Sequence, residues 1–224
     1  MITEQQIDDF QRDGAVVVRG LFADWVDVMA KGIERNMREP GEYASENAVT
    51  QGRFFDDYCN WQRIPEFEHV IRNSPAAELA AYAMRSRTAQ IFHDHVLVKE
   101  PGTPKPTPWH QDAPYYFVEG TQTVSLWIPL DPVREASLRF IAGSHKWDRM
   151  VRPVSWADDT DFYASDDVWI DVPSPSDDEV LEWPMEPGDA VLFDYRTAHG
   201  ARGNETASRR RALSLRFVGD DARY

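Results

Sequence analysis

The feature that most limits the fold is a series of short apolar runs after residue 88. They are rich in β-branched and aromatic residues, and Pro, Gly and Asp separate them, as in EPGT and EPGD. Such runs are typical of β-strands. Because the spacing leaves no room for a helix after each strand, the pattern argues against βαβ units and predicts an antiparallel sandwich or jelly roll. The expected strands are QIFHDHVLVK, TVSLWIPL, SLRFIA, DAVLFDY and RALSLRFV.

The first 88 residues are expected to be mostly helical. Thr3 and Gln6 have the spacing of a capping box, and Gly14 is placed to end that helix. A short strand, AVVVRG, follows, and apolar residues then recur at helical spacing. A chain of 224 residues is long enough for one substantial core. We therefore expect a single domain over residues 1–224, with the helices of residues 1–88 packed outside the β-rich part, residues 89–224.

Composition argues against several classes of partner. The 38 acidic and 24 basic residues give a net charge of −14, which repels nucleic acid and anionic membranes. No apolar run approaches the roughly 18 residues needed to cross a bilayer. The only cysteine, Cys59, cannot form an internal disulfide, so a cytoplasmic protein is expected. These features leave the oligomeric state open.

Candidate metal ligands stand in and beyond the segment WHQD. His110 and Asp112 are two residues apart, so in an extended segment their side chains point to the same face. His199, soon after the run AVLFDY, is the best candidate for a third ligand from a distant strand. Two imidazoles and one carboxylate fill one face of an octahedron and leave the other positions open, as in non-haem Fe(II) oxygenases. The three residues therefore form a candidate Fe(II) site.

An arginine eleven residues after His199 points to an anionic cosubstrate. In the run RRRALSLRF, alternation puts Arg210 and Ser214 on the face opposite Leu213 and Leu215. A guanidinium inside a barrel is costly unless it meets an anion. A dicarboxylate supplies one, because a carboxylate accepts two parallel hydrogen bonds from arginine. We expect Arg210 to bind such a cosubstrate.

In combination, the motifs resemble the phytanoyl-CoA dioxygenase (PhyH-like) family of Fe(II)/2-oxoglutarate oxygenases. The resemblance rests on IDDFQRDGAVVVRGLF, WHQD, LWIPLD, FIAGSHKW, PGDAVLFDYRTAHGARGN and RRALSLRF, and it covers nearly the whole chain. It implies a double-stranded β-helix, with His110, Asp112 and His199 as iron ligands and Arg210 as the anchor of 2-oxoglutarate. The implied reaction hydroxylates an unactivated C–H bond of a small or medium-sized molecule and converts 2-oxoglutarate and O2 to succinate and CO2.

Two departures from the family pattern matter. The chain has REASLRFIAGSH where many relatives have NGxLxFxPGSH. Three consecutive arginines, residues 209–211, compete for the anchoring role, and Arg210 is preferred for its spacing from His199. Asp112 occupies the position where related halogenases carry a small residue, which disfavours halogenation.

Further residues are expected around the cosubstrate. Trp127 and Thr123 share one face of a predicted strand, where Trp127 would pack against the alkyl chain of 2-oxoglutarate. Ser214 would add a hydrogen bond. Lys99 resembles a family lysine near the cosubstrate, and His145 resembles a structural corner of the family.

Substrate contacts are expected from the segment 43–63 and from the loop after the metal ligands. Aromatic side chains of that loop either line the opening or pack beneath it. The acidic segment 157–179 is either a solvated surface loop or a lid over the site. The candidate substrate residues are Tyr115, Tyr116, Phe117, Arg53 and Phe55.

Alternatives concern both the metal site and the function. His93 and His95 repeat the two-residue spacing inside an apolar strand, where a structural histidine pair is favoured over a metal site. One alternative function is a cupin-like metalloenzyme that uses no O2 and does not need Arg210. Another is a catalytically silent ligand-binding barrel. Desaturation and cyclisation share the ligands of hydroxylation, so the motifs do not separate these outcomes.

Overall fold

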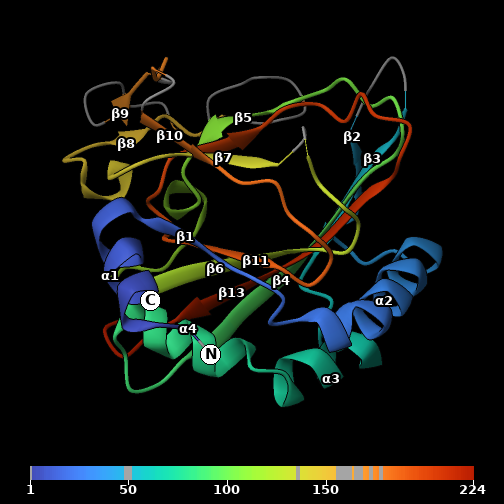
Figure 1. Ribbon diagram of the computed structural model, residues 1–224, viewed down its shortest axis with the longest axis horizontal. Coiled ribbons are helices and arrows are strands. Elements are labelled where there is room, and N and C mark those ends of the chain that lie inside the picture. The colour runs from blue at the N-terminus through green and yellow to red at the C-terminus, as the bar shows by residue number, and fades with distance from the viewer. Residues whose placement is uncertain are drawn as a thin grey trace.

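Two antiparallel sheets face each other, and helices cover the outer side of the larger one (Figure 1). The computed structural model describes residues 2–47, 52–134, 137–154, 163, 169–171, 174–176 and 179–224. The predicted mainly β fold, a double-stranded β-helix with helices packed outside, is confirmed.

The larger sheet has seven strands, and its core is the set β6, β13 and β4. Three strands of the N-terminal part, β1 to β3, join its two edges. Of these, the sequence predicted β1 and missed β2 and β3. In spatial order the strands are β1 (Ala15–Val18), β11 (Ala190–Phe193), β6 (Thr123–Pro129), β13 (Arg210–Val218), β4 (Gln90–Lys99), β3 (Phe54–Tyr58) and β2 (Ser45–Asn47).

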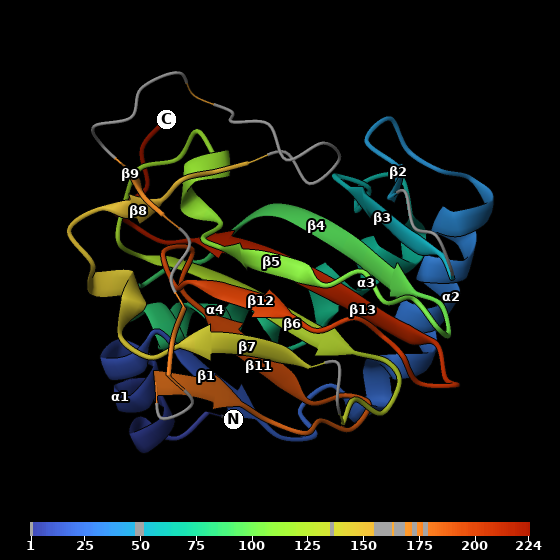
Figure 2. The same cartoon turned by 90° about the horizontal axis from the view of Figure 1, so that it is seen from above.

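The smaller sheet has four strands and lies across the inner face of the larger one. Figure 2, seen from above, shows β5, β12 and β7 side by side over the longer strands. A separate parallel pair, β8 (Met150–Val151) and β9 (Trp169–Ile170), lies outside both sheets. The order in the smaller sheet is β10 (Val180–Glu182), β7 (Leu138–Ile141), β12 (His199–Ala201) and β5 (Thr107–His110).

The helices are α1 (Glu4–Asp13), α2 (Val26–Arg38), α3 (Pro65–Asn73) and α4 (Ala76–Met84). The capping box at Thr3 and Gln6 is present, and Gly14 ends α1 with φ of 80°, a conformation that favours glycine. Within the described residues, no helix has the length and apolar character to cross a membrane.

Alternation along β13 divides the molecule into two apolar layers. Leu213 and Leu215 pack with the helices in the outer core. Ala212, on the other face, packs with Trp127 and Phe140 between the two sheets. Burying these apolar faces holds the smaller sheet over the larger one and leaves the inward polar side chains of β13 in the space between them.

Candidate metal centre

Strand pairing brings two histidines together between the sheets. His199 of β12 pairs directly with His110 of β5, and their ring centroids are 4.2 Å apart. Asp112 lies two residues further, at the start of a 3-10 turn (Ala113–Tyr115). One ligand atom from each residue lies within 4.8 Å of the other two, and all three residues are buried. In the described part of the chain, this is the only group of three or more His, Cys, Asp or Glu side chains with such spacing.

Both imidazoles are oriented by a carbonyl group two residues earlier in the chain. Nδ1 of His110 lies 2.8 Å from the oxygen of Pro108, and Nδ1 of His199 lies 2.9 Å from the oxygen of Thr197. Because a carbonyl oxygen only accepts, Nδ1 donates in each ring, which leaves Nε2 as the nitrogen available to a metal ion. Burial lowers the pKa of His199 to about 3, which keeps this ring neutral.

Asp112 supplies a charged oxygen to the same point. Its Oδ1 lies 3.6 Å from Nε2 of His110 and 3.8 Å from Nε2 of His199. Burial by itself would raise the pKa of Asp112, but the charge of Arg216 and the neighbouring imidazoles hold it well below its ordinary value. Three electron-rich atoms therefore converge, and a divalent cation bound among them would be stabilised by all three.

A cavity beside these three residues lies between the sheets. Arg210 projects into it from β13, and burial lowers the pKa of its guanidinium to about 10, so the group stays charged at neutral pH. Ser214 pairs with Trp127 across β13 and β6. Their Oγ and Nε1 atoms are buried without a hydrogen-bond partner among the described residues. A carboxylate ligand would supply the missing acceptors. The lining residues are His95, Leu97, Thr107, His110, Trp127, Leu138, Phe193, His199, Arg210, Ser214 and Arg216.

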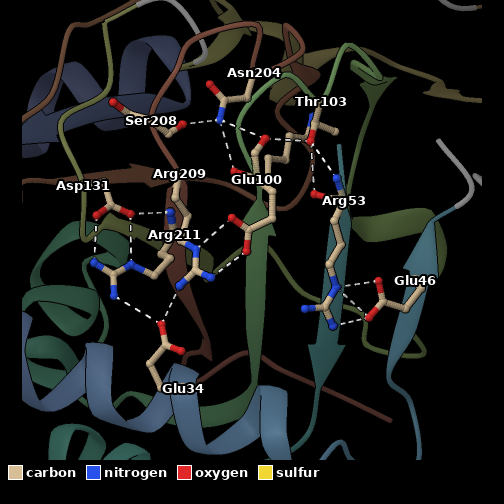
Figure 3. A network of polar contacts seen from close by, with 11 residues as sticks. Glu34, Glu46, Arg53, Glu100, Thr103, Asp131, Asn204, Ser208, Arg209 and Arg211 are labelled. Carbon is tan, nitrogen blue, oxygen red and sulfur yellow. Dashed lines mark hydrogen bonds and ion pairs between the residues drawn. The ribbon is translucent and has the colours of Figure 1, made fainter. Parts of the chain in front are cut away.

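The three consecutive arginines face different surroundings. Figure 3 shows Arg209 and Arg211 directed outward, toward Glu34 on α2. Arg209 lies 2.7 Å from both Glu34 and Glu100, and Arg211 donates to Asp131 at 2.8 and 3.0 Å. Of the three, Arg210 alone lines the cavity, as strand alternation requires. The geometry therefore agrees with the choice of Arg210.

Neither Lys99 nor Thr123 is among the residues that line the cavity. Lys99 is fully buried opposite Arg210, and its Nζ donates to the oxygen of Lys105 at 2.9 Å and lies 3.3 Å from Oγ1 of Thr107. Burial lowers the pKa of Lys99 to about 6. The hydroxyl oxygen of Thr123 accepts a hydrogen bond from the backbone N–H of Tyr195 at 3.3 Å, away from the cavity lining.

The three aromatic residues of the loop after Asp112 have different environments. Tyr115 contacts the backbone of Val154 through its hydroxyl at 3.0 Å, which ties the loop down. The ring of Tyr116 lies 5.8 Å from the guanidinium of Arg216. Phe117 is 76% exposed. Tyr116 therefore lies next to the metal centre, and Phe117 lies at the surface.

The structure places Phe55 and Arg53 away from the cavity. Phe55 is 1% exposed and packs in the core beneath the helices. Its neighbour Phe54 faces inward, 4.8 Å from Nζ of Lys99. Arg53 forms an ion pair with Glu46 at the surface (Figure 3). Residues 53 and 55 lie outside the cavity lining because the inward face of β3 carries residues 54, 56 and 58, and substrate contacts at these two positions stay a prediction.

Three inward residues near the metal centre were not among the predicted site residues. His95 lines the cavity, with Nε2 3.4 Å from Oδ2 of Asp56. Ser125 and Arg216 both contact Asp112. Continuing the alternation of β13 by two more residues from Ser214 would have found Arg216.

The predicted surface loop or lid, segment 157–179, lies mostly outside the described residues. Within it, Tyr163 donates to the carbonyl oxygen of Pro114 at 3.2 Å and stacks on Trp169. At the expected structural corner, the hydroxyl of Ser144, not the imidazole of His145, makes the hydrogen bond beside the metal ligand His199. This hydroxyl accepts from the N–H of Ala198, next to His199, at 2.8 Å.

Comparison with known sequences finds one family model and a related dioxygenase. A sequence model described as phytanoyl-CoA dioxygenase (PhyH) matches residues 10–212. Dioxygenase lolE1 of Epichloe uncinata is 25% identical over 225 residues, which cover 95% of this chain and 81% of that protein.

Solved structures share the fold. The non-haem α-ketoglutarate-dependent carbocyclase SnoK from nogalamycin biosynthesis has a TM-score of 0.79 at 22% identity, covering all of this chain and 86% of that one. The epimerase SnoN, in complex with Fe3+, α-ketoglutarate and nogalamycin RO, has a TM-score of 0.77 at 22% identity, with 99% and 85% covered.

Proposed function

The chain belongs to the phytanoyl-CoA dioxygenase family, and we propose that it hydroxylates an unactivated C–H bond of a small or medium-sized molecule. It is a 2-oxoglutarate-dependent non-haem iron dioxygenase, with Fe(II) as metal and 2-oxoglutarate and O2 as cosubstrates. The observation that supports the hydroxylation proposal most is the buried group of two imidazoles and one carboxylate beside a cavity with a buried arginine.

The metal ligands in this proposal are Nε2 of His110, Oδ1 of Asp112 and Nε2 of His199. The donor set suits the ion, since three protein atoms on one side leave the remaining positions of an octahedron open. When bound, the iron supplies the activation of O2 that is coupled to oxidative decarboxylation of 2-oxoglutarate. The protein orients both imidazoles through the Nδ1 contacts and excludes water by burying all three ligands.

The cosubstrate site in this proposal is the cavity wall formed by Arg210, Ser214 and Trp127. The guanidinium of Arg210 would donate two hydrogen bonds to the distal carboxylate. Ser214 and Trp127 each offer a buried donor that has no partner among the described residues. Lys99, opposite Arg210, would add a second positive group when protonated. A silent barrel has no requirement for these donors.

The substrate is proposed to enter past the loop that carries Tyr116 and Phe117. Both rings lie within 5.6 Å of the ring of Phe92, and Tyr116 also meets His93 at 5.2 Å. These rings offer an apolar surface next to the metal centre, which suits a small molecule rather than a polymer. A cytoplasmic location is proposed from the single cysteine, Cys59, and nucleic acid is disfavoured by the net charge of −14.

Succinate formation tests the proposal. The protein would be incubated with Fe(II), 2-oxoglutarate and O2 against a library of small molecules, with succinate and product masses recorded. We expect at least one compound to raise succinate formation and to gain the mass of one oxygen atom. A coupled product of unchanged mass, or one lighter by two hydrogens, would replace hydroxylation by epimerisation, desaturation or ring closure. Asp112→Ala is the inactive control.

A further inference from the structure

A second inward arginine, Arg216, lies on β13 six residues after Arg210. It is directly opposite Ser125 of β6 on one side and His93 of β4 on the other. Its side chain is 6% exposed, and its Nη1 atom has no hydrogen-bond partner among the described residues. A charge buried to this degree needs a compensating anion. The nearest is the carboxylate of Asp112.

The two oxygens of Asp112 have separate partners. Oδ2 accepts a hydrogen bond from Oγ of Ser125 at 3.1 Å and lies 3.4 Å from Nε of Arg216. Oδ1 faces Nε2 of the two histidines at 3.6 and 3.8 Å. The carboxylate is thus held from behind by one hydrogen bond, from Ser125, and by one ion pair, with Arg216, from neighbouring strands, and its other oxygen is turned toward the imidazoles.

We propose that Ser125 and Arg216 are positioning residues that make Asp112 a single-oxygen ligand. The inference rests on the proposed iron site. With one oxygen from Asp112 and one nitrogen from each histidine, three of six positions are left for the two cosubstrates. A carboxylate that turned to offer both oxygens would take one of those positions. Binding Oδ2 from behind prevents that rotation.

The packing around Arg216 supports a fixed geometry. The ring of Tyr116 lies 5.8 Å from the guanidinium carbon, on the side of the loop that carries Asp112. Paired strand positions set the backbone spacing between Ser125 and Arg216. Ser125 and Arg216 therefore move with the larger sheet, whereas the two histidines lie on the smaller sheet and Asp112 follows its strand β5. The contact also fixes the metal ligands relative to the cosubstrate residues of β13.

A merely structural ion pair would give a different result from a positioning role. Loss of a structural pair would disturb the site as a whole and weaken metal and cosubstrate binding together. Loss of the restraint on Oδ2 would leave metal binding in place, because a carboxylate bound through both oxygens still holds the ion. It would weaken 2-oxoglutarate binding alone.

The test uses Ser125→Ala and Arg216→Gln, with Arg211→Gln on the outward face of the same strand as the matched control. Binding of Mn(II), and then of 2-oxoglutarate to the Mn(II) form, would be measured by calorimetry without turnover. We expect every variant to bind Mn(II) within about threefold of the original protein. The Kd of 2-oxoglutarate should rise about 10-fold in the two positioning variants, which corresponds to about 1.4 kcal/mol, and stay unchanged in the control.

Crystal structures of the Mn(II) forms give the direct readout. One oxygen of Asp112 should contact the ion in the original protein, and two should do so in the positioning variants. Equal 2-oxoglutarate affinity, or parallel loss of Mn(II) and 2-oxoglutarate, overturns the inference. If Arg216→Gln does not fold, Ser125→Ala decides the question, because it removes one donor and no charge. Failure of the original protein to bind Mn(II) would instead overturn the proposed metal site.

Discussion

Replacing Arg210 with methionine is expected to stabilise the ligand-free protein while weakening cosubstrate binding. Burial lowers the pKa of Arg210 from the ordinary arginine value to about 10. At about 1.4 kcal/mol per pKa unit, the charged guanidinium costs the folded state about 3 kcal/mol at neutral pH. The cost is fully present below the folded pKa and disappears as pH rises from there toward the ordinary pKa of arginine. Methionine is uncharged, so the free energy of unfolding should rise by up to about 3 kcal/mol.

The same substitution removes two charge-assisted hydrogen bonds to the carboxylate, and the Kd of 2-oxoglutarate should rise about 100-fold. At a concentration 100 times the original Kd, the ligand should stabilise the original protein by about 2.7 kcal/mol and the variant by only about 0.4 kcal/mol. Urea unfolding of the Mn(II) forms, with and without 2-oxoglutarate, measures both effects. Arg211→Met is the control and should keep the full ligand increment. A destabilised ligand-free Arg210→Met protein with an unchanged increment would refute the reasoning.

Three further substitutions have defined outcomes. His199→Ala should abolish stoichiometric Fe(II) binding, measured as metal content after anaerobic loading. Iron retained by this variant would show that His199 is not a ligand. Ser144→Ala leaves the buried N–H of Ala198 without its acceptor, and should lower the free energy of unfolding by about 1–3 kcal/mol and weaken metal binding, as measured by denaturation and calorimetry. For Lys99, the folded pKa of about 6 lies below the ordinary 10.5, so the unfolded state binds more protons between these values and stability rises with pH. Lys99→Met should flatten that rise between pH 6.5 and 8.5, and an unchanged slope would show that Lys99 is charged in the fold.

The strands of the core could be predicted because their composition and alternation are local. The same alternation correctly turned Arg210 inward and Leu213 outward. The extended geometry assumed for His110 and Asp112 is not present. Asp112 has φ of −69° and ψ of −39° and begins a turn instead of continuing the strand. The pairing of His199 with His110 depends on strand register between segments far apart in the chain, and here the family resemblance supplied what local spacing does not.

Two features of the inner faces could not be predicted, each for its own physical reason. Two adjacent phenylalanines, Phe54 and Phe55, carry no alternation signal, and a one-residue shift in a strand exchanges its two faces. Strand β3 was not expected at all, so the inward side of the segment could not be assigned. Arg216 was overlooked for a different reason. Its role depends on Asp112 and Ser125 meeting it from other strands, which only the folded arrangement shows.

The central claim is that His110, Asp112 and His199 hold one iron ion beside the 2-oxoglutarate cavity. An anaerobic titration with Fe(II) in the presence of 2-oxoglutarate tests it most directly, because the complex of the two has a visible charge-transfer absorption. We expect the absorbance of this band to rise until one equivalent of Fe(II) has been added, and no band to form in the Asp112→Ala variant. A protein that develops no band, or an Asp112→Ala variant that develops the full band, would contradict the claim.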